Sequence, residues 1–454
     1  MTQREFRKKS IMILGLSVLL LVCMIWDSAI FSDSSGESST ANAQTQSVKK
    51  ASVTSGSALI TNVQAVWISF GDYKSAGLYN KSRSAFQANA EKYFKKLKKD
   101  GINTIYFHVV PCNDAIYPSK YLKWSSYMFE AAPDYDPLDI LIKTAHKQDM
   151  TFHAWLNPYR RKMGVSYNPG ADASLKRIQR IVTEIVRNYD VDGIHFDDYF
   201  YPTNIKKYKK VPAATRRQNV NVMVRKVYQT VKQKKKSLKF GISPAGDITY
   251  CEKIGADVRT WLSQSGYVDY IIPQIYWSNN YIMSGKKTAL FNERLAKWRE
   301  INKRDVPMYV GLALYKTGYS LKEDPGWKKS SGNIASQIRQ IRSGNTEGYV
   351  FFAYKDLIRS GAAKELKKYY KAIGKITMNK KKKTLRTGKK YRLRASFWPA
   401  NLHGKIKWKS SNKKIAGVSK KGVVKAKKKG TVRIYAIYGT MKKSCKIIVK
   451  KKRK

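Results

Sequence analysis

The chain has 454 residues, of which 89 are Lys or Arg and 31 are Asp or Glu, so its formal net charge at pH 7 is +58. Apolar residues make up 43% and aromatic residues 12%, which excludes disorder from low hydrophobicity over most of the chain. The length predicts two or more domains. The charge predicts a polyanionic partner, and composition alone leaves nucleic acid, an anionic membrane and an anionic cell wall open.

The N-terminus has the layout of an export signal. Four basic residues between Arg4 and Lys9 precede an uncharged apolar run from Ile11 to Trp26, which is the order of a signal sequence. We predict a signal peptide or membrane anchor over residues 1–30, with cleavage left open. Because Ser, Thr and Gln are frequent after it, we predict a flexible linker over residues 31–61. An extracellular or cell-surface location argues against a nucleic-acid partner.

The spacing of cysteine and histidine residues gives neither a disulfide framework nor a metal site. The exported part holds Cys112, Cys251 and Cys445, an odd number at wide spacing. No CxxC or HxxxH spacing occurs in the chain. We therefore expect no metal and no other cofactor.

Short β-rich segments alternate with amphipathic segments from residue 62 to residue 374. The predicted strands are 63–70, 104–111, 151–158, 193–200, 239–245, 268–277, 307–315 and 348–354. The predicted helices are 85–99, 137–148, 175–189, 215–235, 256–263, 291–302, 333–343 and 357–372. Eight βα units predict an α/β fold, a TIM (β/α)8 barrel. An open doubly wound sheet is the alternative, but no glycine-rich phosphate loop follows the first strand.

The C-terminal ends of barrel strands are where functional side chains lie. In this chain those ends are rich in acids, amides, histidines and aromatic residues. Flat aromatic faces with carboxylates and amides suit a sugar-binding cleft, because pyranose rings stack their apolar faces and present hydroxyls at their edges. The predicted substrate-binding residues are Asp72, Asp114, His153, Trp155, Asn157, His195, Tyr199, Gln274, Tyr276 and Trp277.

The segment DGIHFDDYFYP, residues 192–202, is the most informative in the chain. Strand alternation places His195 and Asp197 on one face and Asp198 on the other. If the apolar side chains face the helices, His195 and Asp197 point into the barrel mouth. Two adjacent acids in a chain poor in acids predict the catalytic carboxylates, Asp197 and Asp198. Asp198 alternatively caps a loop or orients Asp197.

Glycoside hydrolysis usually needs two carboxyl groups, one acting as acid and the other as base or nucleophile. The spacing does not identify the partner of Asp197. Asp72, Asp114 and Asp247 all follow predicted strands, and each is equally readable as a solvated loop acid.

Seven motifs occur in order along the predicted barrel. They are VWIS (66–69), DAIYPS (114–119), YDPLDILIKTAH (135–146), FHAWLNPYR (152–160), YDVDGIHFDDYFYP (189–202), FGISPAG (240–246) and VDYIIPQIYW (268–277). Together they resemble the glycosyl hydrolase-like 10 family of exported bacterial proteins. The resemblance implies a TIM barrel and glycosidase activity on cell-wall glycan, including peptide-free peptidoglycan strands. It maps the family's strand-three, strand-four and strand-six motifs onto His153, Asn157, Asp197, Asp198, Gln274, Tyr276 and Trp277. The family often has Arg before the strand-two proline, where this chain has Val110.

Residues 375–454 hold 30 Lys and Arg and no Asp or Glu. Short predicted strands at 375–379, 391–397, 406–410, 423–426, 431–438 and 444–449 indicate a small all-β sandwich. The segment WPANLHGKIKWKSSNKKIAGVSKKGVVKAKKKGTVRI resembles the bacterial immunoglobulin-like group 2 domain, which implies a core of Trp408, Ile415, Val418, Val423 and Val432. Thirty unopposed positive charges exceed what solubility requires. We therefore predict that this domain binds an anionic cell-wall polymer or a membrane surface.

Three readings follow from these features. The favoured one is an exported glycoside hydrolase that acts on a cell-wall polysaccharide and is held at the envelope by its basic domain. The second is a non-catalytic glycan-binding surface protein. The third, a metal-dependent hydrolase with His153, His195 and Asp197 as ligands, is disfavoured because strand one lacks a His pair. The sequence predicts no oligomeric state.

Overall fold

The computed structural model describes residues 63–202, 208, 210–328, 332–343, 346, 348–358, 361–366, 375–398, 406–438 and 441–451. The predicted export segment (1–30) and linker (31–61) lie outside these residues, as does the predicted domain boundary at residue 374. Within the described ranges, no helix is long and apolar enough to cross a membrane.

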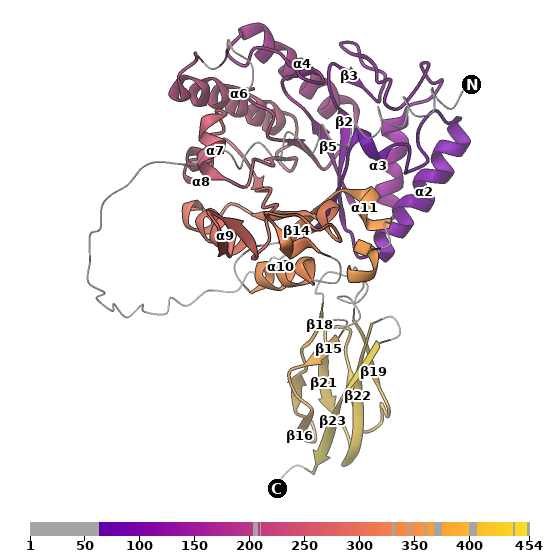
Figure 1. The fold of residues 1–454 in the computed structure, drawn as a ribbon. Helices are drawn as coiled ribbons and strands as arrows, with labels where there is room; N and C mark the ends of the chain where they lie inside the picture. The colour runs from indigo at the N-terminus through magenta and orange to yellow at the C-terminus, as the bar shows by residue number, and fades with distance from the viewer. Residues whose placement is uncertain are drawn as a thin grey trace, which may run out of the picture. The chain divides into compact units, whose positions relative to one another are not determined.

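Eight parallel strands form the sheet of the first domain (Figure 1). They are β1 (Val63–Ile68), β2 (Thr104–Val110), β5 (Thr151–Leu156), β8 (Gly193–Phe196), β9 (Lys239–Ile242), β10 (Tyr270–Ile271), β13 (Tyr309–Ala313) and β14 (Gly348–Phe352). Neighbouring strands follow the order β10-β9-β8-β5-β2-β1-β14-β13. Bridges between Ile271 and Met308 and between Gln274 and Gly311 join the two ends of this order, so the sheet closes. The predicted barrel is confirmed.

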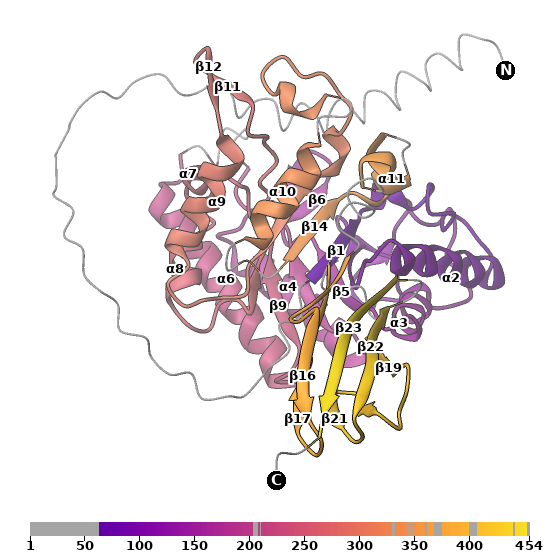
Figure 2. The ribbon, with the colours of Figure 1, turned by 90° about the horizontal axis from the view of Figure 1, so that it is seen from below.

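The helices that cover the barrel are α2 (Arg83–Lys99), α3 (Pro137–Lys147), α4 (Asp172–Asn188), α6 (Ala213–Lys234), α7 (Ile248–Lys253), α8 (Val258–Ser263), α9 (Leu290–Ile301), α10 (Asn333–Arg342) and α11 (Tyr354–Ile358) (Figure 2). Seven of them begin and end within three residues of their predicted limits. The sequence did not predict α7, and α11 begins at Tyr354, three residues before the predicted helix 357–372. In α4, Ile178, Ile181, Val182 and Ile185 are buried, at the spacing of one helix face. Helix α3 begins where the Asp136 carboxylate accepts hydrogen bonds from two backbone amides of its first turn.

Short elements interrupt the loops that follow the strands. They are β3 (Asp114–Ala115), β4 (Lys123–Trp124), β6 (Arg160–Lys162), β7 (Val165–Ser166), β11 (Tyr281–Met283), β12 (Lys286–Thr288) and the 3₁₀ helices η2 (Phe70–Asp72), η3 (Leu314–Lys316) and η4 (Pro325–Trp327). The predicted strand 268–277 is the one most shortened by the structure. Beyond Ile271 it continues only as irregular backbone, which still pairs with the neighbouring strand through the bridge between Ala245 and Gln274.

The interior of the barrel is filled mainly by aromatic side chains. One buried cluster contains Ala65, Trp67, Tyr106, Trp155, Tyr270, Ile272 and Val350. These residues come from strands on different sides of the barrel, so their packing holds the strand ends in fixed positions. The functional side chains described below extend from this rigid layer.

The second domain is an all-β sandwich, as predicted. Its strands are β15 (Lys375–Met378), β16 (Lys382–Arg386), β17 (Lys390–Arg392), β18 (Ala395–Trp398), β19 (Lys407–Ser410), β20 (Ala416–Val418), β21 (Val423–Ala426), β22 (Gly430–Tyr438) and β23 (Met441–Lys450). They form one four-stranded sheet, β16-β23-β22-β19, one three-stranded sheet, β17-β21-β20, and the pair β15-β18. The sequence did not predict β16 and β20.

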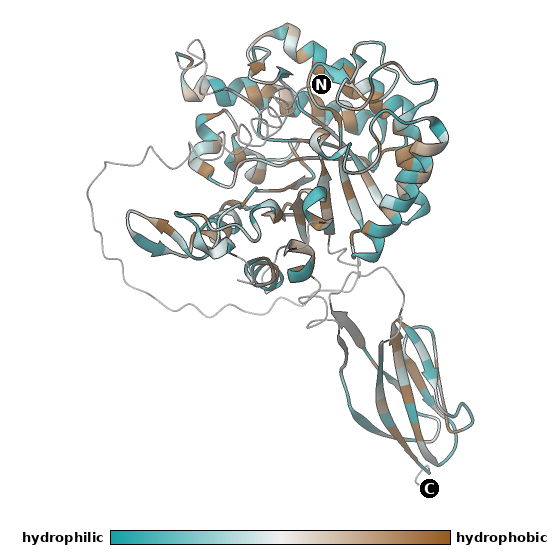
Figure 3. Cartoon of the chain, turned by 45° about the vertical axis from the view of Figure 1, so that its right-hand side comes forward, coloured by the Kyte–Doolittle hydropathy of each residue, from teal (hydrophilic) through white to brown (hydrophobic). Residues whose placement is uncertain are grey.

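One of the five predicted core residues of the sandwich is wrong. Val432 is buried in the core, and Trp408, Ile415 and Val418 pack against it. Val423 does not belong to this core, whereas its neighbour Val424 does. The predicted inward face of this strand was therefore shifted by one residue, and one residue exchanges the two faces of a strand. Figure 3 shows the alternation as brown and teal bands along the strands.

Candidate active site

The two predicted catalytic acids lie where β8 ends. Strand β8 stops at Phe196, and Asp197 and Asp198 follow it directly. On the neighbouring strand β5, Trp155 is the next-to-last residue and Asn157 comes just after the end. Because β5 and β8 are parallel and paired, with Trp155 opposite His195, these side chains meet at the C-terminal edge of the sheet.

Asp197 is held by hydrogen bonds on both carboxylate oxygens. Its Oδ2 accepts from Trp155 Nε1 (3.2 Å) and Asn157 Nδ2 (2.9 Å), and its Oδ1 accepts from the Tyr199 backbone amide (3.3 Å). The residue is 3% exposed. Burial raises the pKa of Asp197 to about 6, although the charge of Arg160 and these hydrogen bonds oppose the rise. The carboxylate therefore has a fixed orientation and titrates near neutral pH.

Asp198 is half-buried and faces the strand-six segment. The Gln274 side chain hydrogen bonds to it, and Gln274 is itself positioned by donating to the Ser243 carbonyl (2.8 Å). Burial is the main cause that raises the pKa of Asp198 to about 7, and the negative charge of Asp197 adds to it. Two adjacent carboxyl groups thus share about one proton near neutral pH, which is the condition for one acid and one base.

Arg160 was not among the predicted site residues, although the strand-three motif contains it. Its guanidinium lies over the ring of Tyr199, 3.7 Å from the ring centroid. Burial alone lowers the pKa of Arg160. The nearby Tyr199, Asp197 and Asp198 raise it by more, so the pKa lies above its usual value. Asn157 Oδ1 accepts a hydrogen bond from the Arg160 backbone amide (3.1 Å). Asn157 therefore orients both the catalytic candidate and the cation beside it.

The aromatic residues of the predicted site lie at different depths. Tyr199 is 40% exposed, whereas Tyr276 is buried beside the rings of Tyr315 and Phe352, with centroid distances of 6.0 and 6.2 Å. The pKa of Tyr276 is raised well above its usual value by burial first, with the charge of Asp198 adding to the effect. Half-buried Trp277 lies next to Tyr276 in the chain and has the Arg294 guanidinium over its ring at 5.8 Å.

His153 and His195 lie in the barrel interior beneath the acids. His195 Nε2 accepts from Trp67 Nε1 (3.1 Å), and both histidine rings hydrogen bond to the Tyr270 hydroxyl (3.1 and 3.2 Å). Burial lowers the pKa of His153 to about 4 and that of His195 well below its usual value. Both rings are therefore neutral near pH 7. Among the described residues, no three acids, histidines or cysteines group as metal ligands.

The structure places Asp72 and Asp114 in contacts of their own. Asp72 accepts hydrogen bonds from the Ser69 amide (2.8 Å) and the Lys355 amide (2.9 Å), which ties the end of β1 to α11. Asp114 Oδ1 accepts from the Cys112 amide (3.0 Å). Asp247, the third acid considered as a partner of Asp197, caps α7 and pairs with Arg294. These contacts favour Asp198 over all three as the partner of Asp197.

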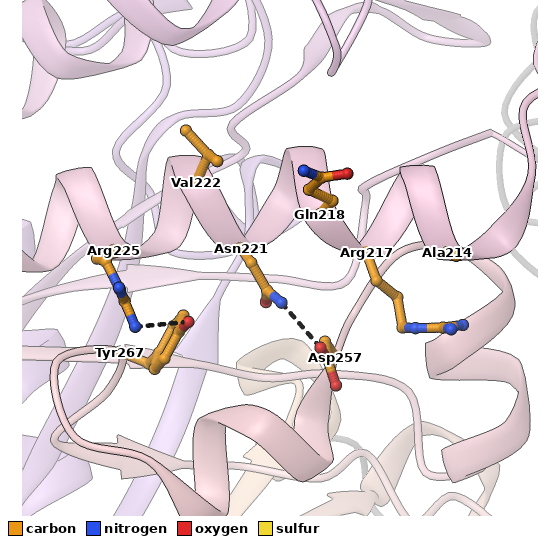
Figure 4. Close-up of a pocket in the computed structure, with 8 residues that line it drawn as sticks. All are labelled: Ala214, Arg217, Gln218, Asn221, Val222, Arg225, Asp257 and Tyr267. Carbon is orange, nitrogen blue, oxygen red and sulfur yellow. Dashed lines mark hydrogen bonds between the residues drawn. The ribbon is translucent and has the colours of Figure 1, made fainter.

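A surface pocket lies on the outer side of the barrel, beside helix α6 (Figure 4). It is lined by Ala214, Arg217, Gln218, Asn221, Val222, Arg225, Asp257 and Tyr267. Arg225 Nη2 donates to the Tyr267 hydroxyl (2.9 Å), and Asn221 Nδ2 donates to Asp257 Oδ2 (2.8 Å). None of the predicted site residues lines this pocket.

Comparison with known proteins agrees with the fold and the motifs. The sequence model of the glycosyl hydrolase-like 10 family matches residues 60–168 and 162–329. The chain belongs to the glycosyl hydrolase-like 10 family. The bacterial Ig-like domain (group 2) matches residues 372–449. Glycosyl hydrolase YngK of Bacillus subtilis (strain 168) is 31% identical, over 65% of this chain and 68% of its own length. Glycosyl hydrolase DigH of Escherichia coli (strain K12) is 32% identical, over 56% of this chain and 71% of its own length.

Solved structures show a more distant likeness. The PgaB (BpsB) glycoside hydrolase domain of Bordetella bronchiseptica has a TM-score of 0.48 at 12% identity, over 67% of this chain and 97% of its own. A glycoside hydrolase family 18 N-acetylglucosaminidase of Paenibacillus barengoltzii has a TM-score of 0.46 at 11% identity, over 68% and 99%. The family membership and the curated relatives support a glycosidase that acts on a glycan.

Proposed function

We propose that this chain is an exported glycoside hydrolase that cleaves bacterial cell-wall glycan, with peptide-free peptidoglycan strands as a substrate. The observation that carries the proposal is the acid pair after β8. Asp197 is fixed by Trp155 and Asn157, and Asp198 is the more accessible of the two. Two carboxyl groups with separated pKa values near neutrality are the minimum equipment for hydrolysis of a glycosidic bond.

The two acids take different roles in this proposal. Asp198, with a pKa of about 7, is the proton donor to the leaving oxygen. Asp197, with a pKa of about 6, is ionised while Asp198 still holds its proton. Its charge keeps Asp198 protonated and stabilises the positive charge that develops on the sugar ring. Arg160 limits how far both pKa values rise, because its charge favours the ionised carboxylates.

Of the other predicted substrate-binding residues, three are placed to contact a sugar bound at the acids. Tyr199, Trp277 and Gln274 are exposed or half-buried at the strand ends, so we propose that they contact the sugar directly. His195 is fully buried, so we propose that it does not contact the sugar. His153 and His195 both hydrogen bond to the Tyr270 hydroxyl and affect the site through that group. The basic domain holds the enzyme at the envelope through its unopposed positive charge.

The test is the release of reducing ends from purified peptide-free peptidoglycan strands. We expect turnover by the wild-type chain and loss of turnover in Asp198→Asn. The matched control is Asp149→Asn, because the Asp149 side chain is 90% exposed and lies outside the acid pair. Equal turnover in wild type and Asp198→Asn contradicts the proposal.

One observation favours a non-catalytic glycan-binding protein as the second candidate. Both oxygens of Asp197 already accept hydrogen bonds inside the protein, and its side chain is almost fully buried. A folded wild-type chain that binds glycan strands but releases no reducing ends supports this second candidate.

A further inference from the structure

The four-stranded sheet of the Ig-like domain is the larger of its two main sheets and carries more outward cations than the three-stranded sheet. In the sheet β16-β23-β22-β19, the buried side chains of β22 and β23 alternate with outward ones. The outward cations of this sheet, here called the basic face, are Lys382, Arg386, Lys407, Lys409, Arg433, Lys442, Lys446 and Lys450. On the sheet β17-β21-β20 the outward cations are Lys390, Arg392 and Lys425.

Strand register arranges the cations of the basic face in rows. Lys382 pairs with Lys446 across β16 and β23, and Lys446 pairs with Arg433 across β23 and β22. Arg386 pairs with Lys450 in the same way. Neighbouring strands lie about 4.8 Å apart, so Lys382, Lys446 and Arg433 form a line of three positive charges at that spacing.

No charge within the domain neutralises these rows. Residues 375–454 contain no Asp or Glu, so these cations have no acidic side chain within the domain with which to form an ion pair. Like charges directly opposite on neighbouring strands destabilise a sheet. A bound polyanion removes this repulsion, and binding to the folded domain then adds to its stability.

The side chains between the rows also suit a particular ligand. Tyr435, Ile437 and Ile448 are half-buried in the basic face, and Lys442 Nζ lies 3.9 Å from the Tyr435 ring centroid. Among the described residues of this domain, no large apolar side chain is exposed. Among its described residues, the basic face is therefore cationic and has no exposed large apolar side chain to insert into a lipid bilayer, which favours a polymer that lies along it over a membrane.

We propose that the basic face binds a linear envelope polymer with phosphate diesters in its backbone. Six of the eight cations are lysines, whose compact charge matches repeated single-charge phosphates without requiring bidentate geometry. The half-buried Tyr435, Ile437 and Ile448 give the carbon atoms between phosphates an apolar surface to contact. This inference rests on the proposed role of the basic domain in holding the enzyme at the envelope, and it assigns that role to one sheet.

Two triple variants of the full chain test the assignment, each removing three positive charges from the same domain. The row variant is Lys382→Gln, Arg433→Gln and Lys446→Gln. The control variant is Lys390→Gln, Arg392→Gln and Lys425→Gln, on the opposite sheet. The probe is soluble poly(glycerol phosphate), with the dissociation constant measured over a series of salt concentrations. Circular dichroism and thermal unfolding confirm that both variants fold.

We expect the row variant to bind at least about tenfold more weakly at low salt, and the control variant to change by less than about threefold. We also expect the slope of log affinity against log salt to fall by about 2 to 3 in the row variant, since each lost contact to a nucleic-acid phosphate lowers it by roughly 0.7 to 0.9. Equal losses in both variants overturn the assignment to one face but leave anchoring by diffuse charge intact.

Two further outcomes separate this inference from the proposed function. Binding of the wild type to phosphatidylglycerol vesicles but not to poly(glycerol phosphate) overturns the inference in favour of a membrane. No binding to either, with normal hydrolysis of soluble glycan strands, overturns both the inference and the anchoring role and leaves the catalytic proposal standing.

Discussion

Replacing Asp197 with Asn removes the negative charge next to Asp198 while keeping the shape and one of the two acceptor oxygens of the side chain. The pKa of Asp198 rises from 3.8 to about 7 in the protein, and burial is a larger cause of this rise than the charge of Asp197. We therefore expect the charge to account for a minor part, about one pH unit, equivalent to about 1.4 kcal/mol. In Asp197→Asn the pKa of Asp198 therefore falls.

The sign of the effect follows from the role of Asp198 as proton donor. Activity is lost as pH rises through the pKa of the donor, so the alkaline limb of the pH–rate profile moves toward acid by about one unit in Asp197→Asn. The acidic limb, which reflects protonation of Asp197, disappears. Because Asp197→Asn lacks one of the two carboxyl groups, the assay follows the residual reducing-end release from peptide-free glycan strands between pH 4.5 and 9. An alkaline limb that stays in place or moves toward higher pH refutes the coupling between the two acids.

Three further changes test other parts of the account. Asp198→Asn lowers turnover by about 10²- to 10⁴-fold. The raised pKa of Asp198 means that its ionised form destabilises the folded state at high pH. The Asn variant therefore has a higher melting temperature than the wild type at pH 8 but not at pH 4. Arg160→Gln raises the pKa values of both acids, since Arg160 lowers them, so the whole pH–rate profile moves about one unit toward alkaline pH, opposite to Asp197→Asn. Ile434→Ala, in the sandwich core, lowers the free energy of unfolding by about 2 to 5 kcal/mol, as measured by urea denaturation.

Each of these has a contrasting result. A melting temperature of Asp198→Asn below that of wild type at pH 8 contradicts the raised pKa. A profile of Arg160→Gln that moves toward acid removes Arg160 from the electrostatics of the pair. For the sandwich, the matched control is Ile437→Ala on the outward face, and a loss as large as that of Ile434→Ala contradicts the strand register.

The fold was predictable because each βα unit carries its own local signal. Strand and helix alternate with the periods of a buried parallel strand and an amphipathic helix, as the buried residues of α4 show. The acid pair was predictable for a similar reason, since position 197 and position 198 follow an apolar strand. The sequence could not predict how deep each site residue lies along the barrel axis, because that depth depends on how neighbouring strands are staggered.

His195 and Arg160 show this limit in two ways: His195 was predicted but lies in the barrel interior, and Arg160 was not predicted but lies beside the acids. Alternation correctly puts His195 on the inner face, but its level beside Trp67 and Tyr270 is set by strands far away in sequence. Arg160 reaches the acids because the chain turns after β5, where Asn157 accepts a hydrogen bond from its amide. The signal that points to it is the spacing of Asn157 and Arg160 in the strand-three motif.

The sandwich shows a third kind of limit. Val423 and Val424 are adjacent and equally apolar, so the sequence alone does not say which one faces inward. Pairing of Val424 with Tyr391 and with Val418 on the neighbouring strands decides it. Strand β16 was missed because it contains two adjacent lysines, Lys382 and Lys383, and only Leu385 is fully buried.

The most direct test of the central claim is a structure of the Asp198→Asn variant bound to a peptide-free peptidoglycan fragment. We predict that the oxygen of the scissile glycosidic bond lies within about 3.2 Å of the side chain at position 198, with Asp197 beneath the sugar ring and still bonded to Trp155 and Asn157. A fragment bound instead in the outer pocket of Figure 4, with the strand ends empty, contradicts the assignment of the active site.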